Sequence, residues 1–342
     1  MKTRLVLVLV CLWTAGSVQA TMTHRYDFAA GPDDVVGGLT STLFGDAVVA
    51  DGSLVTDGAA DWMEMDAAGI GINTYVTGLT LEMWSTQDTE NQSYSLTASF
   101  GGTWDNGYGQ DYIGISTTRG NDVSRAMMAN TPDSDAPWED EVGVDGPELN
   151  DDTEHHYVLT VSDPAADGSG ELAYYVDGVL QGSVPLNGTT IAGLSNMYAY
   201  LGKGIYSVDA EVRCSINEFR IYAAPLTDLE VLANYAVHYE TGEAMPQEML
   251  DRLLVGAERQ DIPTLICANK IDLVGREKAG ILKPGVPAIS GVCDREPQSV
   301  IAEVARHCGA PLSQLGRDFD FRYTPPARID MPSPPGTLDY VG

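Results

Sequence analysis

The chain has 342 residues and a formal net charge of −30, from 49 acidic and 19 basic side chains. Residues 21–240 contain 35 acidic and 6 basic side chains, whereas residues 241–342 contain 14 and 11. The first part therefore repels nucleic acid and anionic membrane surfaces, which excludes nucleic-acid binding, and the contrast between the two parts predicts a domain boundary near residue 240.

The first twenty residues have the pattern of a secretion signal. Two basic residues precede an apolar run from Leu5 to Trp13, and Val18-Gln19-Ala20 supplies a small-residue cleavage site. The apolar run is too short to span a bilayer, and no later stretch is long and apolar enough. We expect a signal peptide at 1–20, a secreted protein that is extracellular or periplasmic, and no membrane span.

Short runs of alternating apolar and polar residues, broken by Gly, Asp and Asn, extend from residue 21 to about residue 225. Residues 79–84 (LTLEMW) and 155–161 (HHYVLTV) are examples. Period-two alternation predicts strands with one buried face, and Asp177-Gly178 predicts the turn of a hairpin at 172–183. The expected fold class is mainly β, an antiparallel jelly-roll sandwich.

One helix is predicted in this part of the chain, from Thr227 to His238. Thr227 is a suitable N-terminal cap because its hydroxyl can accept a hydrogen bond from a free backbone N–H. The apolar stripe at helical spacing consists of Leu229, Val231, Leu232 and Tyr235. This stripe predicts that one side of the helix packs against the sandwich.

The order of five motifs resembles the laminin-G-like branch of the concanavalin A-like lectin/glucanase fold. They are Tyr26-Asp-Phe28, Leu79-Thr-Leu-Glu-Met-Trp84, His155-His-Tyr-Val-Leu-Thr160, Tyr174-Tyr-Val-Asp-Gly-Val-Leu180 and Ile216-Asn-Glu-Phe-Arg-Ile-Tyr222. The last motif departs from the family pattern at Asn217, where many relatives have Asp. The resemblance implies a domain at 21–240 that binds carbohydrate or another extracellular surface polymer through loops at its edges.

A secreted glycan hydrolase of the same fold is the alternative, and it requires two carboxylates across a sugar cleft. In the best-known branch the acids lie on one strand as E-x-D-x-x-E, and this spacing is absent. Glu64-Met-Asp66 lacks the third acid, and a loop-like sequence separates Glu148 from Glu154. The sequence therefore favours a non-catalytic binding module and identifies no catalytic residue.

Two sets of residues in the predicted loops are candidate ligand contacts. Calcium takes six to eight oxygen ligands, and the carboxylates that could supply them are Asp133, Asp135, Glu139, Asp140 and Asp145. A solvated acidic loop without an ion is the alternative, and no cofactor other than calcium is indicated. Trp104 and Trp138 are candidates to stack on a sugar ring, or else they are half-buried packing residues.

Residues 241–342 have a different character. Residues 245–275 resemble the circularly permuted ribosome-assembly GTPase, and Asn269-Lys270-Ile-Asp272 resembles its guanine-reading motif. Residues 276–342 resemble the middle of a folylpolyglutamate synthase/dihydrofolate synthase, and the resemblance places Lys278 at that family's ATP–metal site.

Neither resemblance in the tail brings a complete nucleotide site. The phosphate-cradling G-x-x-x-x-G-K-[ST] loop is absent from the chain, and the chemistry of both families depends on gripping phosphates. A GTPase or ligase working through the tail is therefore the least favoured function. We expect a chimera, in which a β-sandwich precedes an incomplete α/β tail at 241–342 with vestigial nucleotide motifs.

Overall fold

The computed structural model divides the chain into two compact units, Ser17–Ala236 and Met1–Gly16 with Val237–Gly342. The residues that it describes are 20–92, 94–120, 123–131, 135–238, 288–290, 299, 302–303, 305–307, 309–314, 317–318, 320–324 and 337–341. Residues 1–19 of the predicted signal peptide and the predicted boundary at residue 240 lie outside the described residues. Both therefore stay predictions.

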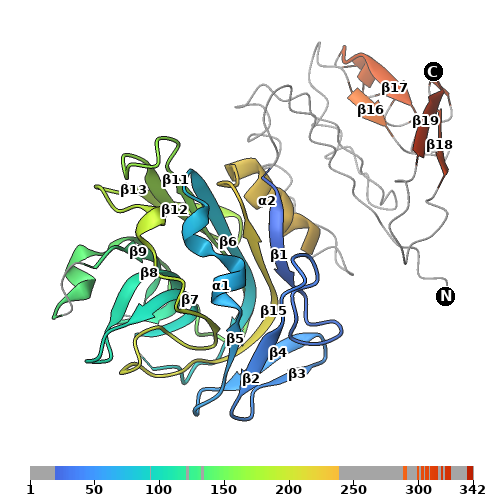
Figure 1. Cartoon of the computed structure of the whole chain (residues 1–342). Coiled ribbons are helices and arrows are strands. Elements are labelled where there is room, and N and C mark those ends of the chain that lie inside the picture. Colours follow the sequence, from blue (N-terminus) through green and yellow to red (C-terminus); the bar gives the residue numbers. More distant parts are fainter. Residues whose placement is uncertain are drawn as a thin grey trace. The chain divides into compact units, whose positions relative to one another are not determined.

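Two antiparallel sheets lie face to face in the first unit (Figure 1). The first sheet contains, in spatial order, β13 (Val179–Pro185), β12 (Glu171–Val176), β11 (Glu154–Ser162), β6 (Gly78–Gln87), β15 (Arg213–Tyr222), β4 (Ser53–Asp57) and β3 (Val48–Ala50), with β1 (Met22–Tyr26) also paired to β15. The second sheet contains β10 (Val142–Gly146), β9 (Val123–Ala129), β8 (Gly109–Arg119), β7 (Ser95–Thr103), β14 (Tyr198–Leu201), β5 (Trp62–Met65) and β2 (Ser41–Phe44).

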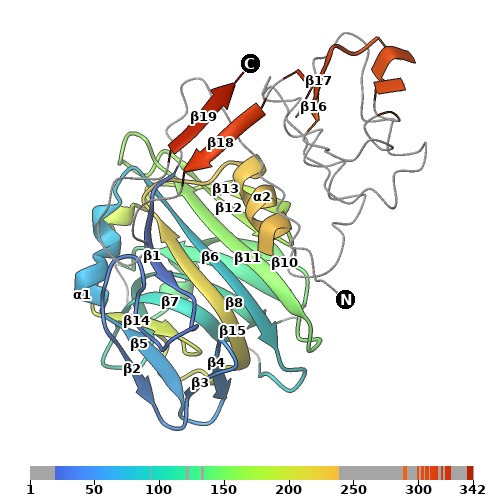
Figure 2. The same ribbon diagram turned by 90° about the vertical axis from the view of Figure 1, so that its right-hand side faces the viewer.

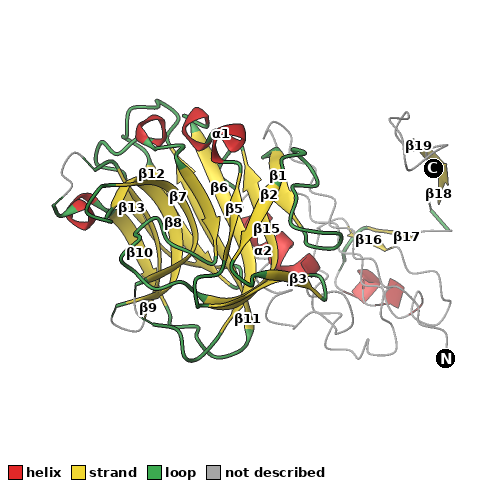
Figure 3. Cartoon of the chain, turned by 60° about the horizontal axis from the view of Figure 1, so that its bottom comes forward, coloured by secondary structure: helices red, strands yellow, loops and turns green. Residues whose placement is uncertain are grey.

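The helical elements of the first unit are few and short beside its strands (Figure 3). They are α1 (Ala67–Ile70), η1 (Ile72–Thr74), η2 (Pro137–Asp140), η3 (Ile191–Gly193) and α2 (Asp228–His238). The prediction of a mainly β antiparallel sandwich is confirmed.

The core of the sandwich follows from the alternation in its strands. In β6 the apolar members Leu79, Leu81 and Met83 are fully buried in the cluster between the sheets. Phe219 of β15 in the first sheet contacts Phe100 of β7 in the second sheet, with ring centroids 6.1 Å apart. Alternate side chains thus interdigitate across one apolar layer, as expected for two packed sheets.

The predicted hairpin joins β12 and β13 at Asp177-Gly178. Both residues have left-handed backbone conformations, with φ of 49° and 68°, which matches the twist of a two-residue hairpin loop. A Cβ at Gly178 would lie 3.0 Å from a Leu232 methyl group of α2, so glycine also permits the helix to pack closely. The prediction is confirmed, and the turn lies against the helix.

The Asp177 carboxylate also holds a histidine of the neighbouring strand. His155 Nδ1 lies 2.8 Å from Asp177, and its Nε2 lies 3.3 Å from Asp151. The hydrogen bond to Asp177 favours the imidazolium form and raises the pKa of His155 above its ordinary value of 6.5. This clamp ties β11 to the hairpin turn mainly when the histidine is charged.

We predict that His155 stabilises the fold more at acidic than at alkaline pH. Because its folded pKa is raised, the contribution is complete below pH of about 6.5 and is lost as the pH rises through the folded value. The His155→Gln variant should lose roughly 0.5–1 kcal/mol of unfolding free energy at pH 6 and almost none at pH 9, measured by urea unfolding. A loss that increased with pH would contradict this account.

Helix α2 lies on the outer face of the first sheet, where Figure 2 shows it crossing the strands. Its start is a capping box, because Glu230 N donates to Thr227 Oγ1 and Thr227 N donates to the Glu230 carboxylate. Its Val231 packs in a buried cluster with Val158 and Tyr222 of the sheet. The predicted helix, its cap and its apolar contact are confirmed.

A buried charged network lies between α2 and the sheet. Glu82 of β6 is fully buried, and its carboxylate accepts hydrogen bonds from Tyr222 at 2.6 Å and from Asn234 of α2 at 3.0 Å. His156 Nε2 lies 3.0 Å away, and Arg220 donates at 3.2 Å. Burial alone would raise the pKa of Glu82, but these partners outweigh it and lower the pKa. The network joins three strands, β6, β11 and β15, and the helix around one carboxylate.

In the second unit the structure describes two small strand pairs. Strand β16 (Ala288–Ser290) pairs in parallel with β17 (Leu312–Gln314), and β18 (Asp320–Thr324) pairs antiparallel with β19 (Thr337–Val341). The nucleotide-motif residues Asn269, Lys270, Asp272 and Lys278 lie outside the described residues. Their assignment therefore stays a prediction.

Candidate functional site

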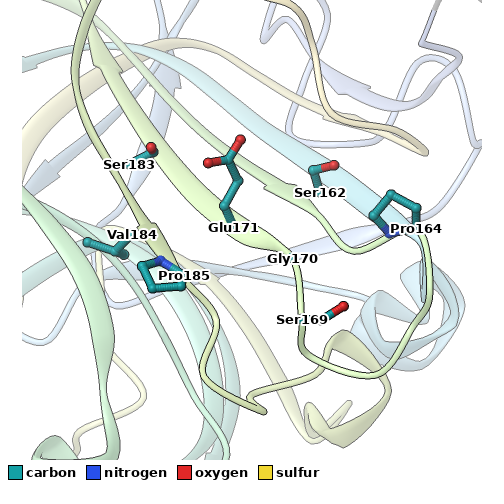
Figure 4. Close-up of a pocket in the computed structure, with 8 residues that line it drawn as sticks. All are labelled: Ser162, Pro164, Ser169, Gly170, Glu171, Ser183, Val184 and Pro185. Atoms are coloured by element: carbon teal, nitrogen blue, oxygen red, sulfur yellow. The ribbon is translucent and has the colours of Figure 1, made fainter.

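One shallow hollow, of about 410 Å³, lies where β11, β12 and β13 end in the first sheet (Figure 4). Its lining consists of Ser162, Pro164, Ser169, Gly170, Glu171, Ser183, Val184 and Pro185. It offers a single carboxylate and no aromatic ring. A hydrolase needs a second carboxylate, and a sugar-stacking site needs an aromatic face, so this hollow supports neither function.

A stronger candidate lies on the outer face of the second sheet, where four aromatic rings pack in series. Trp138 of η2 meets Tyr108 edge to face, with centroids 5.2 Å apart, and Tyr108 lies 6.4 Å from Tyr206. Tyr206 in turn meets Tyr112 of β8 edge to face at 5.4 Å. Trp138 is 46% exposed and Tyr112 is fully buried, so the aromatic cluster runs from solvent down to the sheet.

The aromatic cluster is assembled by the loop at 202–212, which folds over the face of the second sheet. Ser99 of β7 donates a hydrogen bond to the carbonyl of Lys203 and so holds the start of the loop on the strand. A Cβ at Gly109 would lie 2.3 Å from Ile205, so the loop reaches the sheet only because this position is glycine. This glycine at the start of β8 thus lets Tyr206 lie close to the sheet.

Charged residues border the aromatic cluster on β9 and β10. Glu141 is nearly buried and accepts hydrogen bonds from Tyr112 at 2.7 Å and from Arg125 at 2.6 Å. Arg125 also donates to Asp145 at 2.6 Å, and Arg119 lies 3.7 Å from Glu141. Tyr206 donates to the Tyr112 hydroxyl at 3.0 Å, so a hydrogen-bonded path links the rings to the charges.

These partners shift the proton affinities of the site. Burial raises the pKa of Tyr112, and the negative charge of Glu141 raises it further, so the phenol stays a hydrogen-bond donor. Burial would lower the pKa of Arg125, but the hydrogen bond to Asp145 and the charge of Glu141 outweigh it, and the pKa is raised. At neutral pH the site therefore presents fixed donors and acceptors beside an exposed ring.

Asp209, in the same loop, is a half-buried carboxyl. Burial raises its pKa to about 6. Its backbone N–H donates to the carbonyl of Tyr206. Burial raises the pKa of the Tyr206 phenol, and the charges of Glu141 and Asp209 raise it further. Sequence spacing did not identify Asp209, because its raised pKa comes from burial, which the spacing does not reveal.

The two predicted sugar-stacking residues lie in different settings. Trp138 is an exposed member of the aromatic cluster, whereas Trp104 is partly buried in the turn between β7 and β8. The indole N–H of Trp104 is buried and has no hydrogen-bond partner among the described residues. Whether either residue contacts a ligand stays a prediction, although the exposed ring of Trp138 is the better placed.

Of the predicted calcium ligands, Asp133 lies outside the described residues. Asp135, Glu139 and Asp140 are exposed, and Asp145 is paired with Arg125. Those that the structure describes do not form a group of three possible ligands. Calcium binding by these residues stays a prediction.

A group of three carboxylates that could hold a cation lies elsewhere, at Asp46, Asp57 and Asp61, whose oxygens are within 4.8 Å of one another. Asp61 already accepts N–H groups from residues 57–59 with both oxygens. Its hydrogen bonds are therefore satisfied without an ion, and we assign no metal to this group.

A second aromatic group on the same face was missed at the level of sequence. Phe44 stacks on Trp62 with centroids 4.9 Å apart, and the Lys203 ammonium lies 3.4 Å from the centre of the Trp62 ring. Phe44 pairs directly with Trp62 across β2 and β5. The ring of Trp62 is thus engaged by residues of the chain itself.

In the part of the chain that the structure describes, no helix has the length and hydrophobicity required to cross a membrane.

Comparison with known families gives a match over residues 57–232, just over half of the chain, to the family model described as the concanavalin A-like lectin/glucanases superfamily. No curated protein sequence matches the chain. The match lies within the sandwich and does not extend to the residues of the predicted GTPase and ligase fragments.

Several solved structures resemble the chain at low sequence identity. Domain 4 of an extracellular arabinanase from Geobacillus stearothermophilus, in complex with arabinotriose, is 19% identical, with a TM-score of 0.47 over 63% of this chain and 98% of that one. The botulinum neurotoxin type G receptor-binding domain is 14% identical, with a TM-score of 0.45 over 65% of this chain. A Trypanosoma rangeli sialidase in complex with the inhibitor DANA is 16% identical, with a TM-score of 0.48 over 68% of this chain. The chain spans about half of the toxin domain and about a third of the sialidase.

Proposed function

We propose a non-catalytic carbohydrate-binding function for this chain, which belongs to the concanavalin A-like lectin/glucanases superfamily. The observation that supports it is the aromatic cluster, with an exposed indole at its outer end and fixed hydrogen-bonding groups beside it. The ligand we propose is a glycan or glycan-bearing polymer. Fold membership alone permits many functions, so the proposal depends on this site.

The chemistry of the site suits a sugar ring. The C–H face of a pyranose or furanose is apolar and fits the flat exposed face of Trp138, as apolar surfaces fit aromatic rings elsewhere. The half-exposed Asp145 and the partly exposed Arg119 then offer an acceptor and a donor to sugar hydroxyls. Because Tyr108 braces the indole edge to face, the ring is held in place before binding.

We predict that Trp138→Ala weakens binding by about 30-fold, the equivalent of about 2 kcal/mol for a tryptophan hot spot. Affinity electrophoresis of the full chain through gels containing arabinan, galactan, laminarin, xylan or mannan measures it. The matched control is Leu180→Ala on β13, because Leu180 is 45% exposed but lies in the other sheet. Equal losses in both variants, or unchanged binding by Trp138→Ala, would overturn the proposed site.

Glycan hydrolysis is the second candidate, and the Asp209 carboxyl favours it. A pKa raised to about 6 is the property of a general acid, and Asp209 and Glu141 lie around the same tyrosine. The same samples distinguish the two functions. Release of reducing ends from a bound polysaccharide would establish hydrolysis, whereas binding without release supports a binding module.

We further propose that the protein acts outside the cell. The support is the sequence of residues 1–20, with its basic start, apolar run and small-residue cleavage site. N-terminal sequencing of the protein recovered from the culture medium tests it, and an N-terminus at Thr21 is expected. Recovery of the uncleaved chain from the cytoplasm would contradict this location.

A further inference from the structure

We infer that the ligand of this site is an uncharged glycan. Glu141 and Asp145 disfavour anionic glycans because they neutralise the charge of Arg125. The inference rests on the proposed binding function. It concerns the class of sugar that binds, not whether a sugar binds.

The guanidinium of Arg125 lies between two carboxylates, Glu141 directly before β10 and Asp145 within it. Its Nε lies 2.6 Å from Glu141 and its Nη1 lies 2.6 Å from Asp145. In register, Arg125 of β9 is opposite Asp145 of β10. Glu141 and Asp145 flank Gly143 at intervals of two residues, so all three positions face the same side of the sheet.

The glycine between the two acids makes the arrangement possible. A Cβ at Gly143 would lie 2.7 Å from Nε of Arg125 and 2.8 Å from its Cζ. The guanidinium therefore lies close against the backbone at Gly143 and contacts both carboxylates. Only 14% of the arginine side chain is exposed, so little of its charge is available to a ligand.

An arginine beside an aromatic ring would ordinarily attract sulfate, phosphate or carboxylate groups, because its planar fork binds them with two parallel hydrogen bonds. Here that capacity is used within the chain. An anionic sugar would have to displace Glu141 or Asp145, or approach both carboxylates as a like charge. Either route costs binding free energy.

The surroundings do not supply a replacement cation. Residues 21–240 contain only six basic side chains against 35 acidic ones. Two of the six, Arg119 and Arg125, are at this site, and both face Glu141. A third, Lys203, is held over Trp62 and lies 3.8 Å from Glu211. The field over the face therefore opposes anions.

The test compares each neutral polysaccharide that binds with the same polymer after chemical sulfation, so that backbone and length are matched. For the full wild-type chain, sulfation should weaken binding about tenfold or more, and added salt should reduce the difference. In the double variant Glu141→Gln/Asp145→Asn, which keeps the shapes but frees the guanidinium, the difference should fall below about threefold.

A control double variant, Glu148→Gln/Glu171→Gln, removes two exposed charges that do not contact Arg125 and should retain the full discrimination. Tighter binding of the sulfated polymer by the wild type, with loss of that binding in Trp138→Ala, would overturn this inference and leave the proposed function intact. If sulfation weakened binding equally in the two double variants, the role of Glu141 and Asp145 would be overturned. Binding of neither polymer form would instead overturn the proposed function.

Discussion

Replacing Glu82 with glutamine is expected to lower the free energy of unfolding by about 3–5 kcal/mol, because removing one carboxylate from a buried charged network leaves its buried partners short of negative charge and of acceptors. Arg220 would lose its fully buried counter-charge and keep only Glu218, 2.6 Å away, and His156 would lose the acceptor of its Nε2. The amide would offer one acceptor oxygen in place of two, for the donors Tyr222, Asn234 and Arg220 and the His156 ring. The loss should therefore be felt in β6, β15 and α2 together.

Urea unfolding of the full chain, followed by tryptophan fluorescence, measures this change. Glu148→Gln is the control, because this carboxylate is exposed and should change stability by less than about 0.5 kcal/mol. The double variant Glu82→Met/Arg220→Met removes both charges and should recover most of the loss, since well-packed apolar residues often replace a buried pair at little cost. A Glu82→Gln variant as stable as the wild type would show that the network is dispensable.

The fold could be predicted because its information is local. Alternation in 79–84 and 155–161 identifies which side chains are buried without knowledge of their partners, and Asp177-Gly178 carries the turn in two residues. The buried network was not predicted. Glu82 stands out as an acid in an apolar strand, but its partners lie 74 and 138 residues away at His156 and Arg220, where periodicity gives no sign of pairing.

The candidate site was predicted only in part, for the same reason. Trp138 was a candidate either for a sugar contact or for packing, but the rings of its cluster come from two other segments, at Tyr108 and Tyr206, which the sequence did not connect to it. The acidic run was interpreted as oxygen ligands for calcium. That interpretation stays a prediction, but the sequence did not show that Asp145 pairs with Arg125, because a strand pairing that sequence does not reveal places them opposite each other.

The second large effect is expected from Trp84→Ala, which should lower the free energy of unfolding by about 3–5 kcal/mol, the range for removing a large buried aromatic side chain. Trp84 is fully buried beneath α2, with its ring stacked on His156 at 4.3 Å and the Arg220 guanidinium 4.5 Å from its centre. Truncation leaves a cavity and also removes a surface on which two members of the charged network rest.

The matched control is Trp138→Ala, the same substitution at an exposed tryptophan, which should change stability by less than about 0.5 kcal/mol while it weakens glycan binding. The two variants thus separate packing from recognition: Trp84→Ala should shift the urea midpoint at an unchanged m-value, and its folded fraction should bind glycan as the wild type does. Because α2 and the aromatic cluster lie on different sheets, loss of binding by folded Trp84→Ala would mean that the two faces of the sandwich are coupled. That result would contradict a site built only from the second sheet and the loop that covers it.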